Sequence, residues 1–356
     1  MEFVLLGFSD IPNIQWILFG IFLVIYLTIL ICNSIIILVT KTDSALQTPM
    51  YFFLSNFSFL EICYVSVTIP RMLMDLVTQK GNISLLACAT QMCFVLILGG
   101  SECLLLTVMA YDRYVAICNP LHYALVMNHK VCVQLVTASW VSGVPVVIGQ
   151  TCQIFSLPFC GTNTINHFFC DIPPVLKLAC GDTFVNEIAV YVVAVIFIMV
   201  PFLLIVVSYA KIISSILKLT SARGRAKAFS TCSSHLIVVV LFYGTATITY
   251  LQPKPNQSEG TGKLISLFYT VLIPTLNPII YTLRNKDIAM ALKKMFPYFS
   301  SFALTPIFHK LEAKGRPSQL EPINTLESIC SSNTAEHLKT LDQIHFSEDI
   351  PGFADM

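Results

Sequence analysis

Charged residues are scarce in this chain of 356 residues. Asp, Glu, Lys and Arg make up only 12% of it and 55% is hydrophobic, whereas soluble domains carry roughly 25% charged residues. The net charge of +1 provides no basic excess that would attract nucleic acid. Together with the mean hydropathy of +0.75, this excludes an ordinary soluble domain and a nucleic-acid-binding protein. It indicates an all-α integral membrane protein.

Other patterns are also missing. The segment from Met1 to Pro12 has no basic stretch before an apolar core, so we expect no cleavable signal peptide and a first spanning helix that acts as the targeting signal. The cysteines do not show zinc spacing. We find no internal repeat, no nucleophile–base set and no phosphate-binding loop, so the sequence predicts a protein that is not an enzyme and requires no cofactor.

Long apolar segments dominate the chain instead. A helix needs about 20 apolar residues to cross a bilayer. Seven segments meet this length, at roughly 16–40, 50–73, 88–112, 132–152, 186–210, 229–251 and 263–283. The sequence therefore predicts a bundle of seven transmembrane helices.

Basic residues set the expected orientation. The segments after the first, third, fifth and seventh spans contain most of the Lys and Arg residues, among them Arg113, Lys130 and Lys211. Positive loops stay in the cytosol. We therefore predict an extracellular N-terminus and a cytoplasmic C-terminus.

The predicted domains follow from these spans. Residues 1–15 form an extracellular tail and 16–283 the seven-helix domain. Residues 284–299 form a short amphipathic helix, because apolar residues such as Ile288 and Leu292 recur there at helical spacing beside Lys293 and Lys294. Residues 300–356 are polar and acidic, and we expect a mostly disordered cytoplasmic tail.

Two acids lie within predicted spans. Glu61 is in the middle of the second span and Glu102 in the middle of the third. Two carboxylates in a low dielectric cannot both stay ionised without a cation or protons. Intramembrane acids are functional candidates for this reason.

Four cysteines lie on the predicted outer side. Cys88 opens the third span, and Cys160, Cys170 and Cys180 lie in the long loop before the fifth. Four cysteines in an oxidising compartment suggest two disulfides. Three pairings are possible, and the sequence alone does not choose among them.

Several runs have a familiar form. The third span ends in Asp112-Arg113-Tyr114 and is followed by Pro120-Leu121-His122-Tyr123, the sixth begins with the run 227–235, and the seventh contains the run 274–281 with Asn277-Pro278. With the run 49–55, these resemble, in order and over about residues 3 to 296, the odorant receptor family of rhodopsin-like G-protein-coupled receptors. The resemblance implies the disulfides Cys88–Cys170 and Cys160–Cys180.

The resemblance also implies a cytoplasmic switch. Arg113 is held at rest by its neighbour Asp112, and Tyr209 swings inward on activation. His235 is either part of this switch or simply a hydrogen-bonded buried histidine. The expected switch residues are Asp112, Arg113, Tyr114, Tyr209, His235, Pro278 and Tyr281.

In the family pattern Glu61 and Glu102 face each other, with Asn33 and Asn277 nearby. One hypothesis is a sodium ion held between the two carboxylates, which favours the resting state. The alternative is a protonated, hydrogen-bonded pair.

Counting from the motifs places a ligand pocket between the outer halves of the third, fifth, sixth and seventh helices. The expected lining is Met92, Val95, Leu96, Gly99, Gly100, Val190, Val193, Ala194, Phe197, Tyr243, Thr247, Tyr250, Leu267 and Thr270. It contains no charge, so we expect a small, uncharged, fairly hydrophobic ligand rather than an amine. Gly99 and Gly100 either leave space for it or allow close helix packing.

The resemblance implies an odorant receptor in the plasma membrane, in olfactory neuron cilia, that activates a stimulatory olfactory-type G protein and raises cyclic AMP. Asn82 and Asn256 lie in glycosylation sequons of predicted outer loops. A metabolite-sensing receptor expressed elsewhere would share every motif. A small-molecule transporter should show paired broken helices from internal repeats, which the chain lacks.

Overall fold

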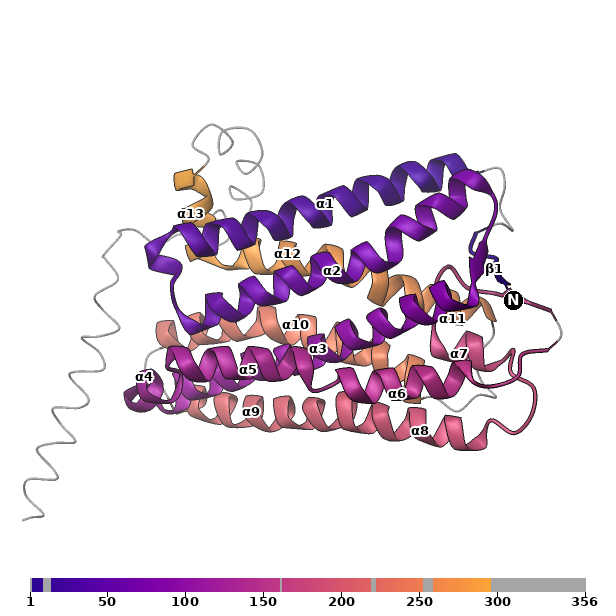
Figure 1. Cartoon of the computed structure of the whole chain (residues 1–356). Coiled ribbons are helices and arrows are strands. Elements are labelled where there is room, and N and C mark those ends of the chain that lie inside the picture. Colours follow the sequence, from indigo (N-terminus) through magenta and orange to yellow (C-terminus); the bar gives the residue numbers. More distant parts are fainter. Residues whose placement is uncertain (1, 9–13, 161, 219–221, 252–258, 296–356) are drawn as a thin grey trace, which may run out of the picture. The chain divides into compact units, whose positions relative to one another are not determined.

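The computed structural model describes residues 2–8, 14–160, 162–218, 222–251 and 259–295, which belong to one compact unit (Figure 1). Long helices lie side by side in this unit, and some are built from two consecutive segments. They are α1 (Gln15–Thr42), α2 (Pro49–Thr78), α3 (Leu85–Cys118), α5 (His129–Val141) with α6 (Val144–Phe155), α8 (Phe184–Ala194) with α9 (Val200–Leu217), α10 (Ala222–Leu251), and α11 (Glu259–Leu267) with α12 (Ile273–Arg284).

These helices correspond to the predicted spans. Six of them are long and apolar enough to cross a membrane, and the seventh contains the shorter apolar stretch His235–Leu251. That stretch belongs to α10, whose 30 residues extend about 45 Å at 1.5 Å per residue. The structure is therefore a seven-helix bundle, as the sequence predicted, with most helices a few residues longer at their ends.

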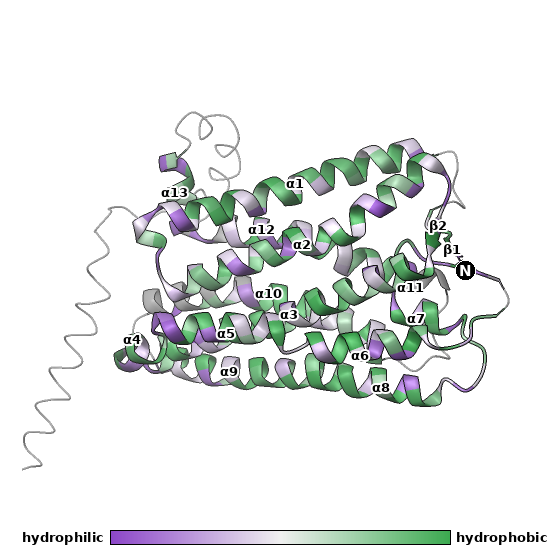
Figure 2. Cartoon of the chain, in the orientation of Figure 1, coloured by the Kyte–Doolittle hydropathy of each residue, from purple (hydrophilic) through white to green (hydrophobic). Residues whose placement is uncertain are grey.

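The helices are mostly hydrophobic along their length (Figure 2), and many of their apolar side chains are exposed. In the most apolar 18-residue stretch of α1, only 22% of the residues are buried, whereas 56% are buried in the corresponding stretch of α3. Large side chains such as Trp16, Val24 and Leu203 are more than half exposed. Exposed apolar surface over whole helices is typical of a lipid-facing perimeter. Helices α2 and α3 form much of the interior.

Two of the long helices contain a π-helical turn. These turns are Val195–Met199, between α8 and α9, and Phe268–Leu272, between α11 and α12. Each is followed by a proline, Pro201 or Pro274. Proline has no N–H, so it cannot donate to the carbonyl four residues earlier, which here belongs to the π-helical turn. The loss of that bond explains why the wider turn is placed there.

A small sheet covers one end of the bundle, which we name the sheet end. Strand β1 (Glu2–Leu5) pairs antiparallel with β2 (Asn82–Ser84) and parallel with β3 (Thr164–Ile165). Gly81 is required beside β1, because a Cβ atom there would lie 1.9 Å from the Leu5 carbonyl oxygen. The sequence predicted a tail at residues 1–15 and gave no indication of this sheet.

The opposite end, which we name the α13 end, carries α4 (Tyr123–Val126) and α13 (Lys286–Met295), whereas α7 (Ile172–Leu176) lies at the sheet end (Figure 1). Ile288 and Ala291 of α13 are buried, whereas Lys294 is exposed and lies 3.5 Å from Asp43. This is the amphipathic helix predicted at 284–299, with its described part ending at Met295. The predicted tail, 300–356, lies outside the described residues.

Candidate functional site

Two disulfides fix the long loop before α8 at the sheet end. Cys88, in the first turn of α3, is bonded to Cys170, and Cys160 is bonded to Cys180. These are the pairings that the resemblance implied. The first bond ties the loop segment 164–172 to α3. Gln91 strengthens this attachment, because its Oε1 accepts from the Cys170 N–H at 3.0 Å while its Nε2 donates to the Val67 carbonyl.

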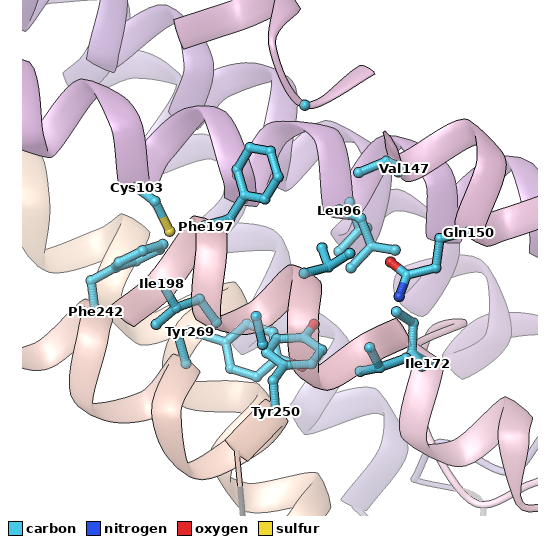
Figure 3. Close-up of a pocket in the computed structure, with 18 of the residues that line it drawn as sticks. Leu96, Cys103, Val147, Gln150, Ile172, Phe197, Ile198, Phe242, Tyr250 and Tyr269 are labelled. Carbon is cyan, nitrogen blue, oxygen red and sulfur yellow. The ribbon is translucent and has the colours of Figure 1, made fainter. Parts of the chain in front are cut away.

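A cavity lies beneath this loop, with a water-accessible volume of about 100 Å³ (Figure 3). Its walls come from several helices and from α7. The lining residues are Tyr64, Val95, Leu96, Gly99, Gly100, Cys103, Gly143, Val147, Gln150, Ile172, Val190, Val193, Ala194, Phe197, Ile198, Phe242, Ala246, Tyr250 and Tyr269. Almost all of them are apolar or aromatic, as expected for a small hydrophobic ligand.

The structure brings much of the predicted lining together. The predicted residues that do line the cavity are Val95, Leu96, Gly99, Gly100, Val190, Val193, Ala194, Phe197 and Tyr250. Gly99 has no atom within 4 Å of the place where a Cβ would stand, and Gly100 has only the Phe197 ring at 3.8 Å. Both glycines therefore leave space at the cavity.

Five predicted residues do not line the cavity. Met92 is fully buried in the cluster beneath the sheet, and Tyr243 donates to the Cys103 carbonyl at 2.8 Å. Thr270 donates to the Ser266 carbonyl at 2.6 Å. Thr247 and Leu267 are also absent from the lining. Counting at a regular helical spacing fails at Thr270, which lies in the π-helical turn 268–272. For Met92 and Tyr243 it chose helix positions that pack against neighbouring elements instead of the cavity.

Sequence reasoning missed the contributions of α2, α6 and the loop. Tyr64 comes from α2, Val147 and Gln150 from α6, and Ile172 from α7. The two π-helical turns add Ile198, next to the predicted Phe197, and Tyr269. The prolines that follow these turns were visible in the sequence, but they did not reveal which side chains the turns would direct inward.

A buried carboxylate that the sequence analysis did not single out lies beside the cavity. Asp171 is 1% exposed, and it accepts from the Tyr250 hydroxyl at 3.0 Å, the Tyr269 hydroxyl at 2.8 Å and the Ile172 N–H at 2.8 Å. Burial raises the pKa of this carboxyl above its usual range. Asp171 itself is not a lining residue, but two of its partners are. It ties the loop to α10 and to the π-helical turn before α12.

His167 makes a second connection between the loop and the helices. Its Nε2 lies 2.8 Å from the Ser266 hydroxyl, and its Nδ1 accepts from the Phe169 N–H at 3.4 Å. These partners suit the neutral ring protonated on Nε2. Burial, with Lys263 nearby, lowers the pKa of His167 to about 3.

The two intramembrane acids meet in the core of the bundle. Glu61 and Glu102 are 0% and 2% exposed, and their charges are close enough to repel each other. Asn277 of α12 donates from Nδ2 to Glu61 Oε1. Within the described residues, Glu61 Oε2, Glu102 Oε1 and Asn277 Oδ1 have no hydrogen-bond partner. Asn33 uses its amide locally, donating to the Ile29 carbonyl at 3.0 Å.

The inner halves of α9 and α10 are linked by two predicted switch residues. The Tyr209 hydroxyl lies 2.8 Å from His235 Nδ1, and the two rings stack with centroids 5.7 Å apart. Both side chains are buried. The pair joins the two helices at the level of Arg113, since the charge of Arg113 acts on both groups.

The hydrogen bond of Asp112 goes to another residue than Arg113, although the charge of Arg113 acts on the Asp112 carboxylate. The Tyr123 hydroxyl of α4 donates to Asp112 Oδ1 at 2.8 Å, and the ion pairs found in the described part of the chain do not include Asp112 with Arg113. Arg113 Nη2 is buried and has no hydrogen-bond partner among the described residues. Asp112 thus attaches the loop helix α4 to α3, because Tyr123 reaches the carboxylate from just beyond the end of α3.

The other predicted switch residues occupy the same end of the bundle. The Tyr114 ring lies beneath Lys211, whose Nζ is 5.9 Å from the ring centroid. Tyr281 packs edge-on against Phe57, with centroids 6.0 Å apart, and Pro278 lies within α12 without ending it.

Of the predicted sequon residues, Asn82 is exposed in β2, and Asn256 lies outside the described residues.

Comparison with known proteins agrees with this architecture. The family model described as olfactory receptor matches residues 22–298. The chain is 79% identical over 295 residues to human olfactory receptor 10AG1, covering 83% of this chain and 98% of that protein. It is 56% identical over 293 residues to human olfactory receptor 10A7, covering 82% and 93%. With its seven membrane-spanning helices, the chain therefore belongs to the olfactory receptor family of G-protein-coupled receptors and is not an enzyme.

Proposed function

We propose that this receptor binds a small, uncharged, fairly hydrophobic odorant in the cavity beneath the loop and activates a stimulatory olfactory-type G protein, which raises cyclic AMP. The observation that carries the proposal is the cavity itself. Its wall is apolar and aromatic, and it is built from α3, α6, α8 and α10 together with the loop. A ligand there touches helices that continue to the α13 end.

The charge distribution supports an uncharged ligand. Asp171 is the acid beside the cavity, but its carboxylate already accepts from Tyr250, Tyr269 and a backbone N–H. An amine ligand would have to displace these donors to reach it. A neutral molecule leaves the three bonds intact.

The sheet end faces the outside of the cell in this proposal. The two disulfides lie there, and disulfides persist in oxidising compartments. The basic residues Lys130 and Lys211 lie toward the other end, as the positive-inside rule requires of the cytoplasmic side. The receptor would act in the plasma membrane of olfactory neuron cilia.

On the cytoplasmic side we place the G-protein site around Arg113. Ligand binding moves the inner half of α10 outward and breaks the contact between Tyr209 and His235. Arg113, whose Nη2 has no partner in the described structure, is then exposed to the G-protein α subunit.

A cyclic AMP assay over a broad panel of volatile molecules tests this function. We expect at least one neutral, hydrophobic volatile to raise cyclic AMP in cells that express the receptor and the olfactory G protein. Arg113→Ala should abolish the response at equal surface expression. A receptor that responds to amines or carboxylates but to no neutral volatile would contradict the proposal and favour a metabolite sensor.

Sodium binding between Glu61 and Glu102 is a further part of the proposal. Three oxygen atoms without partners in the described part of the chain, Glu61 Oε2, Glu102 Oε1 and Asn277 Oδ1, suit a small hard cation that prefers oxygen ligands. Bound sodium would supply the positive charge that two buried carboxylates need, and so stabilise the resting bundle. Replacing sodium by choline should raise basal signalling, and Glu102→Gln should remove this sensitivity. Sodium-independent signalling would favour the protonated pair.

A further inference from the structure

Gln150 is an unusual member of the cavity wall. It lies on α6, one turn after Val147, and both residues line the cavity. Gln150 is 6% exposed, and within the described part of the chain its Nε2 has no hydrogen-bond partner. Figure 3 shows its amide among the lining residues, at the same end of the cavity as Ile172.

Another buried glutamine shows what a structural role requires. Gln91 is 8% exposed and uses both ends of its amide, accepting from the Cys170 N–H and donating to the Val67 carbonyl, each at 3.0 Å. Burying an amide without such partners destabilises a protein. Gln150 carries this cost without contributing a structural bond from Nε2.

Two other polar groups of the wall are already occupied. The hydroxyls of Tyr250 and Tyr269 donate to Asp171. Neither is therefore free to hold a ligand oxygen without breaking the contact between loop and helices. The Gln150 amide, whose Nε2 has no partner among the described residues, is a polar group of the wall that a ligand can use at no such cost.

We propose that Gln150 is the specificity-determining residue of the cavity, and that it hydrogen-bonds the oxygen atom of a neutral ketone, aldehyde, ester or alcohol. The inference rests on the proposed function and narrows its ligand class. An amide presents both a donor and an acceptor. Its N–H can donate to a carbonyl or hydroxyl oxygen, and its oxygen can accept from a hydroxyl. Hydrocarbons of the same shape leave the amide unpaired and bind more weakly.

The geometry also orients the ligand. Gln150 and Ile172 lie at one end of the cavity, and Cys103 and Phe242 at the other (Figure 3). The oxygen therefore lies at the Gln150 end, and the apolar body extends along Phe197 toward Phe242. A branched or cyclic body fits beside Gly99, where no atom lies within 4 Å of a Cβ position.

Matched ligand pairs test the inference. Each pair combines a ketone or alcohol with the hydrocarbon of the same carbon skeleton, and cyclic AMP potency is measured for the native receptor, Gln150→Leu and Gln150→Met. We expect the native receptor to prefer the oxygenated member by about tenfold, the effect of one hydrogen bond, and both variants to lose this preference. The matched control Val147→Leu alters the same wall without changing its polarity and should keep the preference.

Thermal stability separates a ligand role from a structural one. Both Gln150 variants should have an apparent Tm in detergent, without ligand, at least equal to that of the native receptor, because they remove an unpaired buried amide. An unchanged oxygen preference in both variants would overturn the inference while leaving the proposed function intact. A native receptor that responds to no volatile would overturn both.

Discussion

At the scale of single residues, the structure brings together the acid pair that the resemblance implied, whereas five residues of the predicted binding surface lie outside the cavity. Glu61, Glu102 and Asn277 come together in the core, and Tyr209 meets His235. Asp171 and Gln150 were not predicted. Their importance depends on which neighbours the loop and α6 bring to them, and no local pattern in the sequence encodes that.

Gly81 provides a test of the sheet. Gly81→Ala should displace β1, because the new Cβ would overlap the Leu5 carbonyl oxygen. We expect a loss of about 1–3 kcal/mol in stability and faster hydrogen exchange in residues 3–5. Gly20→Ala in α1 is the control, since nothing lies within 4 Å of that Cβ. Equal behaviour of the two variants would contradict the role assigned to Gly81.

His167 should make the loop sensitive to acid. The pKa of His167 is lowered to about 3 in the folded receptor, against about 6.5 in the unfolded chain. The neutral His167 ring therefore contributes its full share to the free energy of unfolding above pH 6.5. This contribution is lost progressively as the pH falls toward 3, because the unfolded chain binds a proton that the folded receptor does not. Between pH 7 and pH 5 this amounts to about 2 kcal/mol.

The measurement compares apparent Tm at these two pH values in the native receptor and in His167→Gln, which keeps a donor and an acceptor but does not titrate. The native receptor should lose more stability. The raised pKa of Asp171 makes the folded receptor more stable as the pH falls, opposite to the effect of His167. Asp171 is present in both proteins, so its effect cancels when their pH profiles are compared. Parallel pH profiles would show that His167 does not titrate as described.

At the scale of secondary-structure elements, the sequence predicted every spanning helix but not the irregularities within them. Apolar length alone locates a span. It does not locate the break between α5 and α6 or the π-helical turns before Pro201 and Pro274. Phe197 and Tyr269 of these turns line the cavity. The predicted lining was most accurate in α8 and in α3, where Met92 alone lies outside it, whereas neither Leu267 nor Thr270 lines the cavity.

The contact of the loop with the helices should depend on Tyr269. Tyr269→Phe removes a donor from the buried Asp171 carboxylate, and we expect a loss of about 1–3 kcal/mol, read as a lower apparent Tm. Tyr26→Phe removes an exposed bond between α1 and α2 and should cost only about 0.6 kcal/mol. If the two variants were equally stable, Asp171 would not be the connection between loop and bundle.

At the scale of the whole molecule, the fold follows from the sequence because lipid leaves few alternatives. Backbone groups in a bilayer must be satisfied within the chain, so apolar segments of sufficient length form helices. The sheet at the end of the bundle could not be predicted in this way. It forms outside the lipid from three short segments that are distant in the sequence.

The central claim is that occupancy of the cavity by a small molecule controls signalling, and two glycines test it most directly. A Cβ added to Gly99 or to Gly149 would have no atom within 4 Å, but Gly99 lines the cavity whereas Gly149 is exposed on α6. The measurement is the cyclic AMP response to activating volatiles in Gly99→Leu and Gly149→Leu at equal surface expression. Gly99→Leu should lower potency about tenfold or more, because the side chain takes the ligand's space, and Gly149→Leu should respond normally. Full potency in Gly99→Leu would contradict the account.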